Sequence, residues 1–250
     1  MFNYNYGFNY NLTRNLKINY NVTSSNIVRS YLDSEGVPID SYTIWDDYWN
    51  TGEANQHTQQ ITANYELPLN KIPFLSFLKS TYSYQSNYNW QRSSDGLSSI
   101  ESEGVWYNLG NTIQNSNTHQ LNNTLNMDLF YKYIGLTQKA QPKTVARPTT
   151  PVPGQRVTGN QQTPATQRSV FVDGLIGVVT SLKTVQVNYT ENNGTVLPGY
   201  LPSVGFLGTS KPTLGFVMGS QDDIRYEAAV NGWLTNYPHY NQNYTQINSK

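Results

Sequence analysis

The sequence predicts an antiparallel all-β fold, an arc of about six strands belonging to a larger transmembrane β-barrel. Three observations support this fold class. Apolar and polar residues alternate strictly in several segments, the connections between these segments are alternately short and long, and charges are scarce. Aromatic residues and charged residues each make up 13% of the chain, whereas soluble domains carry about 25% charged residues.

The segment Asn3–Val22 shows the alternation most clearly. Its even positions carry Tyr, Phe, Leu, Ile and Val, and its odd positions carry mainly Asn, on both sides of Thr13–Asn15. Successive residues of a strand point to opposite faces, so this period of two predicts one apolar and one polar face. The pattern keeps its phase across Thr13–Asn15, which predicts a β-hairpin with a tight turn.

Four later segments repeat the pattern and complete the predicted strands: Gln59–Leu67, Leu78–Trp90, His119–Leu129 and Thr184–Thr190. Several reach the roughly 9–11 residues that a tilted strand needs to cross a bilayer. In this interpretation the apolar stripe faces lipid and comprises Tyr4, Tyr6, Phe8, Tyr10, Leu12, Ile18, Tyr20, Val22, Ile61, Tyr65, Tyr82, Tyr84, Leu121, Leu125, Met127, Val185 and Val187. The polar stripe faces an aqueous lumen and comprises Asn5, Asn9, Asn11, Asn19, Asn21, Thr62, Asn64, Thr81, Gln85, Asn122, Thr124, Asn126, Gln186 and Asn188.

The connections follow the rule of outer-membrane barrels, in which short turns are periplasmic and long loops are extracellular. Thr13–Asn15 and Pro68–Phe74 are short, whereas Ser24–Gln56, Gln91–Thr118 and the chain from Glu191 onward are long and are expected outside. Within the last of these, the glycine-rich segment Gly194–Gly219 fits either a constriction folded into the lumen or an ordinary extracellular cap.

The stretch Gln141–Arg168 interrupts the pattern, because it is rich in Pro, Thr and Gln and contains basic but no acidic residues. Its low apolar content predicts a flexible linker. After it, apolar residues at helical spacing predict a short periplasmic amphipathic helix against the barrel rim; they are Phe171, Leu175, Val178, Val179 and Leu182. The chain therefore divides into strands one to five with their loops (1–139), the linker (140–168), and the helix, strand six and a glycine-rich loop (169–250).

An arc of this size cannot stand alone in a membrane, since the smallest single-chain barrels have about eight strands and open sheet edges are costly in lipid. No apolar run is long enough for a transmembrane helix, and the first residues lack the features of a signal peptide. Because the first predicted strand starts near Met1, we expect the natural start of the protein to lie further upstream.

Composition and motifs argue against catalysis, metal or cofactor binding, and nucleic-acid binding. The net charge is zero and cysteine is absent. Neither a phosphate-binding loop nor a nucleophile elbow is present. The sequence contains three acidic pairs: Asp46–Asp47, Glu101/Glu103 and Asp222–Asp223. We interpret them as solvated charges in loops, and calcium binding is the more specific alternative. The histidines lack the partners of a zinc site; they are His57, His119 and His239.

Aromatic residues in the long loops have two interpretations. They form a contact surface for cargo or an accessory subunit, or they pack the long loops against each other over the barrel mouth. The residues concerned are Trp45, Tyr48, Trp49, Trp106 and Tyr107.

Three stretches are distinctive in the order of their residues and not only in their composition. The first is Ile44–Gln91, which begins IWDDYWNTGEANQ; the second is Leu109–Met127 with Leu129–Leu136 (LFYKYIGL); the third is Asn192–Gly208 (NNGTVLPGYLPSVGFLG) with Pro212–Arg225 (PTLGFVMGSQDDIR). They resemble the SprA (Sov) family, the giant outer-membrane translocons of the Bacteroidota type 9 secretion system. The resemblance implies a cell outer membrane location, and a very large barrel that exports folded proteins and supports gliding motility at the cell surface. It also implies the partners: secreted cargo proteins, accessory plug and periplasmic or surface subunits, and outer-membrane lipid. At 250 residues the chain is a small part of such a protein.

Two other readings of the sequence remain open. One is another outer-membrane barrel, such as a transporter or an adhesin anchor, whose strands would alternate in the same way. The other is a soluble Tyr/Asn-rich surface adhesin without a lipid-facing band.

Overall fold

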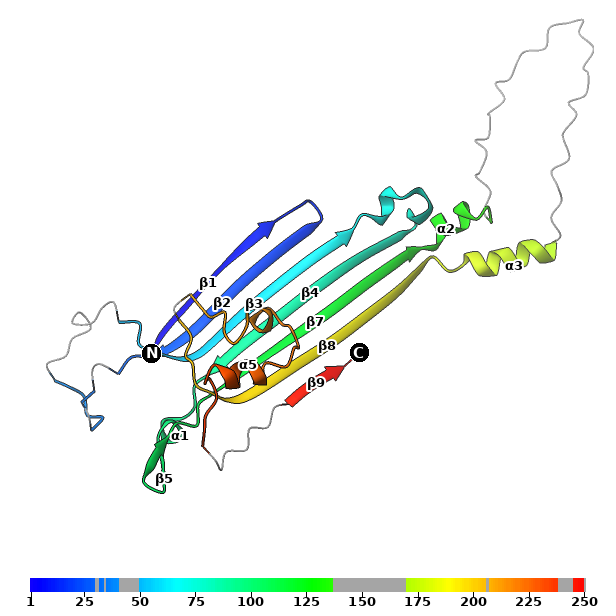
Figure 1. Cartoon of the computed structure of the whole chain (residues 1–250). Coiled ribbons are helices and arrows are strands. Elements are labelled where there is room, and N and C mark those ends of the chain that lie inside the picture. The colour runs from blue at the N-terminus through cyan, green and yellow to red at the C-terminus, as the bar shows by residue number, and fades with distance from the viewer. Residues whose placement is uncertain are drawn as a thin grey trace, which may run out of the picture. The chain divides into compact units, whose positions relative to one another are not determined.

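The computed structural model describes residues 1–29, 32–33, 35–40, 50–136, 170–205, 207–237 and 245–249. These residues form mostly antiparallel β-structure with few helices, in agreement with the predicted all-β class. The main sheet has the strand order β1-β2-β3-β4-β7-β8-β9 (Figure 1). Its strands are β1 (Phe2–Asn11), β2 (Leu16–Ile27), β3 (Glu53–Leu67), β4 (Leu78–Gln91), β7 (Asn111–Asn126), β8 (Thr184–Tyr200) and β9 (Thr245–Ser249). Within the described residues the sheet is open, with β1 and β9 at its two edges.

The chain forms two compact units. Unit 1 comprises Met1–Leu67, Ser80–Asn122 and Asn188–Lys250, and unit 2 comprises Pro68–Lys79 and Asn123–Val187. A separate two-stranded sheet in unit 1 pairs β5 (Ile100–Ser102) with β6 (Val105–Tyr107).

The predicted first hairpin is confirmed. β1 and β2 pair antiparallel, with Tyr6 opposite Val22 and Tyr10 opposite Ile18. Thr13 closes the turn, because its Oγ1 accepts hydrogen bonds from the backbone N–H groups of Asn15 and Leu16, at 3.2 and 3.0 Å. Leu12 belongs to this turn and not to the strand.

The sheet register sorts the side chains onto two faces. Tyr20 lies opposite Ile61, and Ala63 lies opposite Tyr84. By strand alternation, the face that we call the aromatic face carries Tyr4, Tyr6, Phe8, Tyr10, Ile18, Tyr20, Val22, Ile61, Tyr65, Tyr82, Tyr84, Leu121, Leu125, Val185 and Val187. The opposite face, the amide face, carries Asn5, Asn9, Asn11, Asn19, Asn21, Thr62, Asn64, Thr81, Gln85, Asn122, Thr124, Asn126, Gln186 and Asn188.

The predicted strand His119–Leu129 is wrong at both ends. β7 begins at Asn111 and ends at Asn126, and Met127 starts the helix α2 (Met127–Tyr133). The Asn126 side chain accepts a hydrogen bond from the backbone N–H of Leu129 at 3.1 Å, which caps the first turn of the helix. Met127 and Leu129 therefore do not belong to the apolar stripe of a strand.

Several predicted long loops are shorter in the structure, because the strands continue into them. β2 reaches Ile27, β3 starts at Glu53, and β8 reaches Tyr200, ten residues beyond its predicted end at Thr190. The loop between β4 and β7 also contains the short helix α1 (Asp95–Ser98) and the β5–β6 hairpin.

Unit 2 contains the short connection and the predicted helix. Two 3₁₀ turns, η1 (Leu69–Lys71) and η2 (Pro73–Leu75), make the short connection between β3 and β4. A helix is present as predicted, α3 (Val170–Thr180), but it ends before Leu182, which the predicted helix includes. The predicted linker 140–168 lies outside the described residues. No helix among the described residues is both long and apolar enough to span a membrane.

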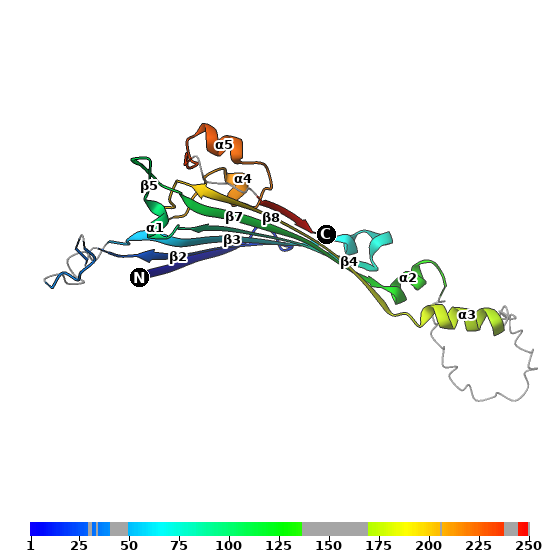
Figure 2. The ribbon, with the colours of Figure 1, turned by 90° about the horizontal axis from the view of Figure 1, so that it is seen from below.

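One segment of unit 1 folds back over the aromatic face. This segment, which we call the cap, runs from Leu201 to Tyr237 and contains α4 (Leu214–Val217) and α5 (Arg225–Val230). Figure 2 shows α4 and α5 on one side of the sheet. The contacts of α4 and of the residue after it are with β4 and β7, through Tyr84, Tyr88 and Asn115. The buried core lies between the cap and the sheet and comprises Tyr88, Trp90, Ile113, Leu197, Tyr200, Phe216, Val217, Ile224 and Ala228.

Candidate functional surface: a two-faced sheet with a capped end

The amide face is an almost uncharged hydrogen-bonding surface. Gln60 Nε2 donates to Asn87 Oδ1 at 3.0 Å, and Ser83 Oγ donates to Asn64 Oδ1 at 2.6 Å. The charged residues at these alternating positions, Lys17, Glu66 and Lys79, each lie one residue from a strand end. Such a face suits contact with water, because transfer of amide and hydroxyl groups into hydrocarbon carries a high free-energy cost.

The aromatic face has the opposite chemistry over the half of the sheet near the short turns. Phe8 packs against Tyr20 with 5.4 Å between the ring centroids, and both Phe8 and Tyr10 are exposed. On β8, the side chain of Val187 is 52% exposed. The described residues leave this apolar half uncovered, so it requires a partner or a non-aqueous environment.

The other half of the aromatic face is covered by the cap through polar contacts as well as apolar ones. Asn115 Nδ2 donates to the carbonyl oxygens of Phe216 and Ser220, at 2.8 and 2.7 Å. Asn117 Nδ2 donates to the carbonyl oxygen of Gly219 at 2.6 Å, and Tyr84 OH donates to that of Met218 at 2.5 Å. These side-chain donors add to the backbone hydrogen bond that Phe216 O already accepts from the N–H of Gly219, and they tie α4 and the residues after it to the strands.

The cap changes how one predicted apolar residue is interpreted. Val22 is only 1% exposed within the chain itself, so its side chain has no surface to offer to lipid. Its neighbours on this half of the face are buried polar residues, including Ser24, His57 and Gln59. The aromatic face is thus divided into a capped half that is partly polar and a free half that is mostly apolar, with His119 and Asn123 as its polar positions on β7.

The strand β7 continues well beyond its contact with the cap. Its last eight residues, His119–Asn126, follow the Asn117–Gly219 contact. At a rise of about 3.4 Å per residue, they extend over roughly 27 Å before any tilt. The apolar band of outer-membrane barrels is about 25 Å tall.

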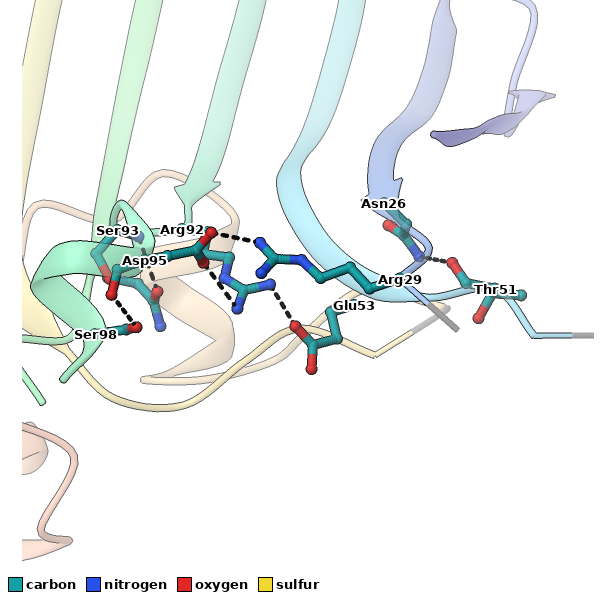
Figure 3. A network of polar contacts seen from close by, with 9 residues as sticks. Asn26, Arg29, Thr51, Glu53, Arg92, Ser93, Asp95 and Ser98 are labelled. Carbon is teal, nitrogen blue, oxygen red and sulfur yellow. Dashed lines mark hydrogen bonds and ion pairs between the residues drawn. The ribbon is translucent and has the colours of Figure 1, made fainter. Parts of the chain in front are cut away.

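A network of ion pairs fixes the long-loop end of the sheet (Figure 3). Arg92 pairs with Glu53 at 2.5 Å and with Asp95 at 3.5 Å, and Arg29 pairs with Asp95 at 2.7 Å. The hydrogen bond from Arg29, followed by the charges of Arg29 and Arg92, holds the pKa of Asp95 below its usual value. The network ties the ends of β2, β3 and β4 to α1.

The predicted acidic pairs are not brought together with one another as a metal site would require. Asp223 binds Arg225, which lowers the pKa of Asp223 to about 2, and Asp222 accepts a hydrogen bond from Ser220 at 2.5 Å. Glu101 and Glu103 are exposed, and Asp46–Asp47 lie outside the described residues. In the part of the chain that the structure describes, no three His, Asp or Glu side chains gather as metal ligands would.

The histidines and loop aromatics are dispersed. His57 is buried beside Gln59 beneath the cap, His119 is hydrogen-bonded to Tyr82 at 2.7 Å, and His239 lies outside the described residues. Tyr107 packs against Tyr237 of the cap, with 5.1 Å between ring centroids. Trp106 is 65% exposed. Trp45, Tyr48 and Trp49 lie outside the described residues.

Sequence reasoning missed Asn115 and Asn117, the two amides that hold the cap. Both occupy apolar-face positions of β7, where an amide breaks the expected alternation. This break in the alternation could have revealed the contact with the cap, because a buried amide on a strand requires hydrogen-bonding partners from another segment.

No family profile matches the chain. No curated protein matches it either.

Proposed function

We propose that this chain is part of the wall of an outer-membrane β-barrel that conducts proteins across the membrane. In this proposal the free half of the aromatic face contacts lipid, and the amide face lines the aqueous passage. The observation that carries the proposal is the separation of side chains into one apolar and one neutral polar face along the same strands.

The chemistry of the amide face decides which side faces lipid. If the amide face met hydrocarbon, side chains such as Asn19, Thr62 and Asn122 would lose water without gaining partners. The side chains on the aromatic face, such as Tyr20, Ile61 and Leu121, are suited to contact with hydrocarbon. Because the cap shares the aromatic face, it lies on the outer side of the wall and beyond the lipid band. The proposal thus favours an extracellular cap over a constriction in the lumen.

The open edges of the sheet support a larger barrel. β1 is a ten-residue edge strand with no proline and no charged residue, so it lacks the usual protection against pairing with a further strand. β9 covers only Asn192–Val196 of β8, which leaves Thr184–Glu191 as a second open edge among the described residues. In a larger barrel, neighbouring strands would pair with both open edges and satisfy their backbone hydrogen-bonding groups.

The resemblance of the three quoted stretches supports the proposal that this wall belongs to the translocon of the type 9 secretion system. Its role would be passive: it holds the passage open in the outer membrane for folded cargo proteins, with accessory plug and periplasmic or surface subunits as partners. Gliding motility would follow from the export of motility proteins. A neutral passage would contact many cargo surfaces without strong charge selection.

A cross-linking experiment tests the conduit. A photoactivatable residue is placed at Asn122 on the amide face, or at Leu121 on the aromatic face as the matched control, in the full-length protein in its native cells. A secreted cargo protein stalled during export should cross-link to position 122 and not to position 121. Equal or absent cargo cross-linking at both positions would contradict a protein-conducting role.

A second candidate, an adhesin anchor in the outer membrane, is favoured by the exposed loop aromatic Trp106. It predicts that stalled cargo cross-links to neither position, while both faces of the sheet remain in their assigned environments.

A further inference from the structure

The short-turn end of unit 2 exposes an unusual number of apolar side chains. They come from the connection between β3 and β4, from α2, and from α3 with the residues that follow it. Their exposed fractions run from 36% to 72%, and they are Ile72, Phe74, Leu129, Tyr133, Ile134, Leu175, Val178, Val179 and Leu182. In water such a set is an aggregation hazard, so it points to a non-aqueous partner.

The exposed helix α3 is held in place by α2. Tyr131 of α2 is buried, with 3% exposed, and its hydroxyl donates to the carbonyl oxygen of Val179 at 2.6 Å. α2 is itself fixed to the connection, because Phe130 packs edge-on against Phe77 with 5.0 Å between ring centroids. The apolar side chains of α3 therefore belong to an element with defined packing.

The charged residues of unit 2 that the structure describes are mainly lysines. The segment Gly174–Leu182 contains no charged residue. Lysines exceed aspartates among the described residues of unit 2: the lysines are Lys71, Lys79, Lys132 and Lys183, and the aspartates are Asp128 and Asp173. Long lysine side chains can cover apolar surface while their ammonium groups stay in water or reach anionic headgroups.

The apolar set also continues into the lipid-facing stripe. The chain passes from Leu182 through Lys183 directly into β8, where Val185 and Val187 lie on the aromatic face. Lys183 pairs with Asp128 at 3.3 Å at this junction.

We propose that α2 and α3 lie in the membrane interface, with the exposed apolar side chains of α3 dipping into the edge of the hydrocarbon. The occupant of this surface is the lipid bilayer, and the two helices form an anchor that sets the depth of the wall. This inference rests on the proposed membrane location of β8, and it differs from the periplasmic helix expected from the sequence, which would only pack against the rim.

Spin labels test the anchor, because the chain contains no cysteine of its own. Single cysteines at Leu175, Val178, Val187 and Asn188 are labelled in the full-length protein in native membranes. Collisions with oxygen report hydrocarbon, and collisions with a water-soluble nickel complex report water. The labels at 175 and 178 should collide several-fold more with oxygen than with nickel, as should the label at 187, while the label at 188 should favour nickel.

The control positions keep the two proposals separate. If the labels at 175 and 178 favour nickel, or are shielded from both reagents as by a protein partner, while the label at 187 favours oxygen, the anchor is wrong and the membrane wall stands. If the label at 187 also favours nickel, the membrane wall itself is wrong.

Discussion

Asn117 on β7 donates a hydrogen bond from Nδ2 to the carbonyl oxygen of Gly219 in the cap, with 2.6 Å between the two atoms. This contact marks the boundary between the capped and the free half of the aromatic face. Above it, strand side chains are polar where they meet cap carbonyls. Below it, the same face is mostly apolar, with His119 and Asn123 as polar positions on β7, and the described part of the cap does not cover it.

Removal of the neighbouring amide should release the cap. In Asn115→Leu, the carbonyl oxygens of Phe216 and Ser220 both lose the Asn115 donor, and Phe216 O keeps its backbone hydrogen bond from Gly219, so the loss costs the cap roughly 1–3 kcal/mol. Hydrogen exchange of the backbone amides of Phe216–Ser220 should accelerate accordingly. Gln114→Leu, one residue away on the exposed opposite face, should leave that exchange unchanged. Equal protection in both variants would show that Asn115 does not hold the cap.

The close approach of Gly219 to the sheet should make this position intolerant of alanine. A Cβ at Gly219 would lie 2.5 Å from Ser86 Oγ and 2.6 Å from Tyr84 OH. Gly232→Ala is the matched control, since Gly232 also has a positive φ but has no atom within 4 Å of a built Cβ. Both variants bear the strain of about 1–2 kcal/mol for a left-handed residue. Only Gly219→Ala should add about 1–3 kcal/mol of overpacking, seen as faster proteolysis of the cap.

The rim network should weaken in acid. The pKa of Asp95 is lowered in the folded protein, so its ion pairs contribute fully above the unfolded value of about 3.9 and are lost as the pH falls through the lower folded value. Protection of the Leu97 and Ser98 amides, corrected for intrinsic exchange, should stay constant from about pH 7 to pH 5 and fall below about pH 4. Asp95→Asn should remove this dependence, whereas a fall that persists in the variant would implicate another group.

An arginine should be tolerated on one face of β7 and not on the other. Leu121→Arg places a charge in the proposed lipid band, at a cost of about 2–4 kcal/mol near the midplane. Asn122→Arg places the same charge in the aqueous passage. The amount of folded full-length protein in the outer membrane should fall for Leu121→Arg and stay unchanged for Asn122→Arg. Similar losses for both would argue that neither face contacts lipid.

The sequence predicted the long strands because the free half of each strand largely keeps a period of two, with His119 and Asn123 as exceptions on β7. The sequence did not predict the capped halves of these strands, because positions such as Asn115, Asn117 and Thr195 carry polar side chains on the aromatic face. Those side chains bind backbone carbonyls and a glutamine of the cap, and such partners leave no periodic trace in the sequence.

Local chemistry explains the remaining differences. In the sequence, the alternation of apolar and polar residues continues through Met127. In the structure, the side chain of Asn126 acts as the N-cap of α2, so a helix starts at Met127. β9 was not foreseen, because Thr245–Ser249 contains a single large apolar residue, Ile247, and pairs only by backbone contacts along β8. Of the candidate surface, the two faces were predictable from the sequence, whereas the division of one face by the cap was not.

The most direct test of the two-faced wall is thiol labelling of β2 in the full-length protein in native membranes. Single cysteines replace Ile18, Asn19, Tyr20 and Asn21 in turn, and a membrane-impermeant reagent is added. Cysteines at 19 and 21 should label, because the amide face lines water, and those at 18 and 20 should not, because lipid covers the aromatic face. Equal labelling at all four positions would contradict a membrane wall.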